Sequence, residues 1–138
     1  MIESKFNTQV CTTREQSEWL LALGLKKETA DCHLLYGNWK CDARIGKKDE
    51  WNTDPAWSLD RLIAMIPDRI YADGNLWNLS IQSLQVEYSR VDSETIGYKK
   101  SLKCFGYYKD SLYDSVVQCI EWLIKNKHFN EEYLEETK

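Results

Sequence analysis

Long apolar runs and catalytic motifs are what this sequence lacks. No stretch reaches the ~18 consecutive apolar residues that a membrane-spanning helix needs, and residues 1–15 are charged and polar where a secretory signal would be apolar. The motifs GxxxxGK[ST], GxGxxG, HExxH and GxSxG are missing too, and with them the usual signatures of nucleotide hydrolysis, dinucleotide binding, zinc proteolysis and hydrolase chemistry. We therefore expect a cytoplasmic protein that makes no membrane contact, and a role that is more often binding than catalysis.

Histidine is scarce, with two residues, against five cysteines. The cysteines are an odd number without a CxxC pair, which is typical of reduced thiols packed as small apolar groups. Cys32, His33 and Cys41 are close in sequence, but their spacing fits no common zinc finger and adjacent strand residues point to opposite faces. His128, near a helix end, is explained by the helix dipole rather than by a catalytic role. The sequence predicts no metal, no cofactor and no catalytic residue.

Phenylalanine is rare as well, with three residues, whereas tryptophan and tyrosine number six and eight. Most of these rings must therefore fill the core. At 138 residues, of which 43% are hydrophobic, the chain suits one core, and we expect residues 1–138 to form a single domain. The net charge of −4 disfavours nucleic-acid binding through the field of the whole molecule.

Two short helices are predicted in the first half of the chain. A capping box, either Thr12 with Glu15 or Thr13 with Gln16, predicts a helix over 14–23 that ends at Gly24. A brief strand is expected over 32–36. Apolar residues recur at helical spacing after Ser58, which predicts a second helix over 58–66, stopped by Pro67.

Alternating residues replace the helical period after Pro67, which predicts strands. Asp73-Gly74 suits a hairpin turn, and a bulge or turn near Gln82-Ser83 must reset the pleat. Leu102 and Cys104 then alternate with lysines and serine. A small antiparallel sheet of about three or four strands, from about residue 70 to 108, is the simplest product.

The last helix has the clearest signal. Its apolar stripe, capped by Asp110 or Ser111, consists of Leu112, Val116, Cys119, Ile120 and Leu123. We expect this stripe to cover the sheet, since burying each large side chain contributes ~1.5 to 3 kcal/mol. A ragged helical turn is expected after residue 131. The fold class predicted is α+β, with a long C-terminal helix packed on the antiparallel sheet.

Three hypotheses of function follow from the side chains. The leading one is a non-catalytic module that binds another protein or its own copy through exposed aromatics, namely Trp39, Trp51 and Trp57. The second is a nucleic-acid accessory protein that uses a strand of lysines and aromatics, namely Lys99, Lys100, Lys103 and Tyr107. The third is an enzyme of unrecognised type that uses the carboxylates near Trp57, namely Asp49, Glu50, Asp54 and Asp60.

Four segments carry a resemblance: EQSEWLLALGL, TAD, PAWSLDRLIAMIP and DSLYDSVVQCIEWLIKN. In this order they resemble a group of small bacterial proteins of unknown function that prophages and other mobile elements carry. The resemblance covers about half of the chain and leaves out the sheet region. It implies a bacterial, cytoplasmic setting and an accessory role, and it carries no site residue.

Overall fold

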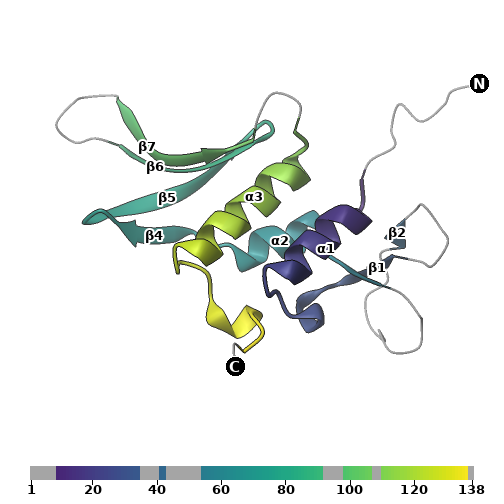
Figure 1. The fold of residues 1–138 in the computed structure, drawn as a ribbon. Helices are drawn as coiled ribbons and strands as arrows, with labels where there is room; N and C mark the ends of the chain where they lie inside the picture. The colour runs from purple at the N-terminus through teal and green to yellow at the C-terminus, as the bar shows by residue number, and fades with distance from the viewer. Residues whose placement is uncertain (1–8, 35–40, 43–53, 92–97, 107–109, 137–138) are drawn as a thin grey trace, which may run out of the picture. The chain divides into compact units, whose positions relative to one another are not determined.

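Helices and antiparallel sheets make up the computed structural model, which describes residues 9–34, 41–42, 54–91, 98–106 and 110–136 (Figure 1). The predicted α+β class is confirmed. The chain divides into two compact units, Met1–Arg61 and Leu62–Lys138, which are described separately. No helix in the described segments is long and apolar enough to cross a lipid bilayer.

The first unit begins with α1 (Arg14–Ala22), which is set by its caps. Of the two predicted capping boxes, the one formed is Thr13 with Gln16: the Gln16 N–H donates to Thr13 Oγ1 at 3.1 Å, and the Thr13 N–H donates to Gln16 Oε1 at 3.0 Å. At the other end Gly24 has a φ of +102°, and the Leu25 N–H donates to the Leu20 carbonyl at 3.1 Å. Local signals therefore place this helix, one residue shorter than predicted.

A small antiparallel sheet follows a 3-10 turn, η1 (Lys27–Thr29), in the same unit. Its strands are β1 (Cys32–Leu34), β2 (Cys41–Asp42) and β3 (Asp54–Ala56), in the order β2-β1-β3. Cys32 pairs with Ala56 and, together with Cys11, they form a buried apolar cluster. Helix α2 (Leu59–Met65) is one residue shorter at each end than predicted, and Ser58, the predicted N-cap, accepts the Arg61 N–H through its Oγ at 3.1 Å.

The second unit contains a four-stranded antiparallel sheet in the order β4-β5-β6-β7. The strands are β4 (Arg69–Ala72), β5 (Asn75–Gln82), β6 (Gln85–Val91) and β7 (Lys99–Phe105). The predicted turn at Asp73-Gly74 is present, with φ values of 53° and 75°. The predicted pleat reset is a turn, since Ser83 has a φ of 55° and Gln82 pairs with Gln85.

Helix α3 (Leu112–Lys125) lies along one face of this sheet and contacts β6 and β7 (Figure 1). Of the two predicted caps, Asp110 and Ser111, the cap formed is Ser111, which makes a capping box with Asp114. The Trp122 ring packs on Tyr88 and Phe105, with ring centroids 6.3 Å and 5.8 Å apart. The predicted stripe is buried at Val116, Cys119, Ile120 and Leu123. A last 3-10 turn, η3 (Glu131–Tyr133), matches the helical turn expected there.

The predicted alternation in β7 is wrong at its C-terminal end. Cys104 is exposed, whereas the next residue, Phe105, is buried against Trp122. The reason is a register shift beside Tyr88 and Ser89, where one extra β7 residue interrupts the pairing with β6. Such a bulge reverses the faces of the residues on either side of it.

Candidate binding surface

Trp57, predicted as an exposed partner-binding residue, is buried, with 0% of its surface exposed. Its indole N–H donates to Thr29 Oγ1 at 2.9 Å, and its backbone N–H donates to Thr12 Oγ1 at 3.0 Å. The prediction failed because the polar groups that satisfy this ring lie far away in the sequence. Trp39 and Trp51, the other two aromatics of that hypothesis, lie outside the described residues.

Polar contacts beside Trp57 are those of a helix start. Asp31 Oδ1 accepts the Ser58 N–H at 2.8 Å, and Asp31 Oδ2 accepts the Ser58 hydroxyl at 2.5 Å. The Arg61 Nε–H donates to the Thr29 carbonyl at 2.7 Å. Burial, followed by the charge of Asp31, raises the pKa of the Cys32 thiol to about 12. This thiol is therefore not a nucleophile at neutral pH, and the cluster stabilises the start of α2.

The three lysines of the predicted nucleic-acid strand are all exposed on β7. Register partners in an antiparallel sheet point to the same side of the sheet, and the partners of these three lysines lie on different sides. The lysines therefore do not share one face. Lys99 pairs with Glu87, which also accepts the Ser101 hydroxyl at 2.9 Å. The hydrogen bond from Lys99 is the main cause that lowers the pKa of Glu87 below its ordinary value. Lys100 and Lys103 are register partners of Arg90 and Tyr88.

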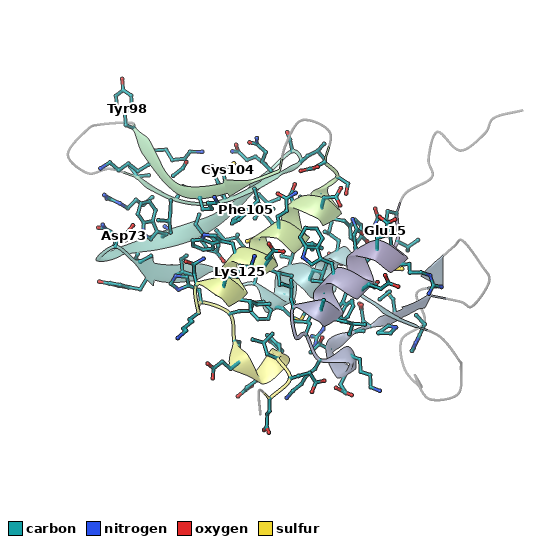
Figure 2. The ribbon with its side chains drawn as sticks, in the orientation of Figure 1. Glu15, Asp73, Tyr98, Cys104, Phe105 and Lys125 are labelled. Carbon is teal, nitrogen blue, oxygen red and sulfur yellow. The ribbon has the colours of Figure 1, made fainter. Side chains whose placement is uncertain are left out.

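Two tyrosines flank these lysines in the sequence, and the structure describes one of them. Tyr107, the aromatic of that hypothesis, lies outside the described residues. Tyr98, which precedes β7, is 67% exposed and projects away from the sheet (Figure 2). Binding of nucleic acid by this strand stays a prediction.

The face of the four-stranded sheet opposite α3 carries a row of exposed apolar side chains. Tyr71 on β4 pairs with Leu76 on β5, and the β5–β6 register, continued from Asn78↔Ser89, brings Leu76 opposite Val91. These three side chains are 69%, 44% and 73% exposed. Val91 pairs in turn with Lys99. We call Tyr71, Leu76 and Val91 the open-face row.

The helix-covered face is assigned by its aromatic contacts. Tyr88 contacts Trp122 of α3, and Val86 and Tyr88 are register partners of Ile81 and Leu79. Trp77 has the same parity as Leu79, so it shares that face, and Leu76 has the opposite one. The open-face row therefore lies on the side of the sheet away from α3.

The carboxylates of the enzyme hypothesis do not gather around a described cavity. Asp60 is exposed on α2, and Asp49 and Glu50 lie outside the described residues, as does the side chain of Asp54. A surface hollow of about 320 Å³ lies elsewhere, in the second unit, and its lining includes Pro67, His128 and Tyr133. His128 also stacks on Trp122, with ring centroids 5.5 Å apart. The hollow therefore gives the carboxylate hypothesis no support.

The cysteines differ from the predicted set of reduced thiols. Cys11 is disulfide-bonded, which makes the prediction wrong for this residue, whereas Cys32, Cys104 and Cys119 are free thiols. Burial raises the pKa of the Cys119 thiol. Within the described segments, no three His, Cys, Asp or Glu side chains gather as a metal site requires.

Sequence reasoning did not single out the open-face row. The Asp73-Gly74 hairpin places Tyr71 opposite Leu76 and could have suggested that pair. The alternation in β5 and β6 marks the apolar, covered face of the sheet, but it does not show that Leu76 and Val91 lie side by side on the other face. Comparisons with protein-family models, curated proteins and solved structures found no match to this chain. The resemblance to prophage proteins therefore stays a prediction.

Proposed function

We propose that this protein is a non-catalytic binding module that contacts another protein through the open face of its four-stranded sheet. The open-face row carries the proposal, because three large apolar side chains in adjacent positions are exposed together. Contiguous exposed apolar surface marks interaction sites more often than chance exposure does. Tyrosine in particular gives a large contact area at a small cost in rotamer entropy.

The surroundings of the row fit a protein interface better than a catalytic site. Arg69 and Asn78 are exposed beside it, which suits the polar rim of a protein interface. Glu87 and Lys99, which also lie on this face, are paired with each other. The resemblance to prophage proteins supports an accessory role in bacteria.

The compartment is part of the proposal. The sequence favours the cytoplasm, whereas the disulfide at Cys11 favours an oxidising compartment, because cytosolic disulfides are rare. We retain the cytoplasm as the expectation from the sequence. The thiol assay described in the Discussion distinguishes the two.

Site-specific photo-crosslinking tests the interface. A photoreactive phenylalanine analogue at Tyr71 is expected to cross-link to a partner protein in the native host, whereas the same residue at Lys125, exposed on α3, is not. Leu76→Asp should abolish the Tyr71 cross-link, because a buried unpaired carboxylate opposes binding. Cross-linking of the purified chain reports whether the partner is a second copy. Equal cross-linking at Tyr71 and Lys125 would exclude this face as the interface.

A further inference from the structure

We propose that Arg90 and Lys100 form a binding site for a phosphate group. Arg90 on β6 and Lys100 on β7 are direct register partners, so their side chains lie on the same face of the sheet. Like charges directly opposite each other in a sheet are destabilising. A pair of this kind is stabilised when an anion lies between the two cations.

Among the described residues, the charge of Arg90 has no anionic partner. The Arg90 guanidinium lies over the Trp77 ring, with its Cζ 5.3 Å from the ring centroid. Its Nε is buried and has no hydrogen-bond partner among the described residues. Trp77 is itself held in place, because its indole N–H donates to the Ala72 carbonyl at 2.8 Å. The aromatic contact therefore orients the guanidinium without satisfying its Nε–H donor.

Glu87, the one acidic residue of β6, has other partners. Glu87 accepts hydrogen bonds from Lys99 and Ser101 on the open face of the sheet. No ion pair joins Arg90 or Lys100 to any residue in the described part of the chain. The pair lies near the Asp73 end of the sheet. Arg90 is half-buried and Lys100 is exposed, so an anion can approach the pair from solvent on the Lys100 side.

Phosphate fits this arrangement by its chemistry. A guanidinium presents a planar fork of N–H donors that matches two phosphate oxygens, and a lysine ammonium adds a mobile point charge. A carboxylate ligand would use the fork equally well but has fewer oxygens left for the ammonium. The same group occurs in free phosphate esters and in the backbone of nucleic acids. Lys100 belongs to the lysine strand predicted from the sequence, whereas its partner in this site, Arg90, comes from the neighbouring strand β6.

NMR titration of the full chain with inorganic phosphate tests the site. The Arg90 Nε–Hε resonance is expected to shift as phosphate binds. In Lys100→Gln the apparent Kd should rise about tenfold or more, as expected for loss of a charged hydrogen bond. Lys125→Gln is the matched control, since it removes the same charge from α3 of the same unit and should leave the Kd unchanged.

Two further arms make the result decisive. Competition by a short oligothymidylate identifies the ligand as a nucleic-acid backbone, whereas phosphate binding without competition identifies a small phosphate ester, and both support the site. Tyr71→Ser should leave phosphate binding unchanged, because it lies on the opposite face. The proposal is overturned if phosphate leaves the Arg90 resonance unmoved, or if Lys100→Gln and Lys125→Gln weaken binding equally.

Discussion

Gly106, which follows β7, is the position where one added carbon should destabilise the protein most clearly. Its φ of +106° lies in the left-handed region. An alanine Cβ there would overlap Ser115 Oγ, and it would lie 2.7 Å from the Leu84 carbonyl oxygen and 3.2 Å from Ser115 Cβ. Ser115 cannot move freely, because its hydroxyl donates to that same carbonyl at 2.5 Å.

The magnitude of the Gly106→Ala effect combines two terms. A left-handed φ costs a residue with a Cβ about 1–2 kcal/mol, and overpacking a rigid site costs about 1–3 kcal/mol more. We therefore expect the free energy of unfolding to fall by about 2–5 kcal/mol, measured by urea unfolding followed by circular dichroism.

Two other glycines are matched controls. Gly24 has a nearly equal φ of +102°, and Gly74 lies in the same unit as Gly106 with a φ of +75°. A Cβ at either position would have no heavy atom within 4 Å. Gly24→Ala and Gly74→Ala should therefore lose only the conformational term of about 1–2 kcal/mol. If all three variants lose the same stability, the close approach of β7, Leu84 and α3 is refuted.

The remaining predictions concern the buried tryptophan and the thiols. Trp57→Phe should lower the free energy of unfolding by about 1–3 kcal/mol, because it removes the buried hydrogen bond to Thr29. The double variant Trp57→Phe/Thr29→Val should lose less unfolding free energy than the two single variants lose in sum, because both remove the same bond. Strictly additive losses would show that the bond contributes nothing to stability. Without a reductant, iodoacetamide should modify the exposed Cys104 first, followed only slowly by Cys32 and Cys119, which are buried with raised pKa values. After unfolding in urea without a reductant, which exposes the buried Cys11, peptide mapping should still recover this residue unmodified, whereas its alkylation in unfolded protein from the native host would indicate a reducing compartment.

Local signals made much of the fold predictable. Capping boxes at Thr13 and Ser111 start two helices, and Asp73-Gly74 turns the first hairpin of the larger sheet. Each of these signals acts on backbone groups only a few residues away in the sequence, because it caps an amide or allows a positive φ. The alternation predicted in β7 is wrong at its C-terminal end, because the bulge depends on pairing with β6.

The candidate site was far less predictable from the sequence. Exposed tryptophan was expected at Trp57, which instead donates a hydrogen bond to Thr29, 28 residues away in the chain. The sequence predicts Lys100 as a candidate site residue, but it does not point to Arg90, the register partner of Lys100. The two meet only through the β6–β7 register.

The amino-acid sequence by itself determined where helices start and stop, where strands replace them, and that the last helix has an apolar stripe. These features follow from side-chain spacing and backbone conformation within single segments. Only the tertiary structure decided that Trp57 is buried, that the open-face row is exposed and that Arg90 faces Lys100. Burial and cross-strand pairing join residues that are distant in the chain, and no local pattern specifies which of them meet.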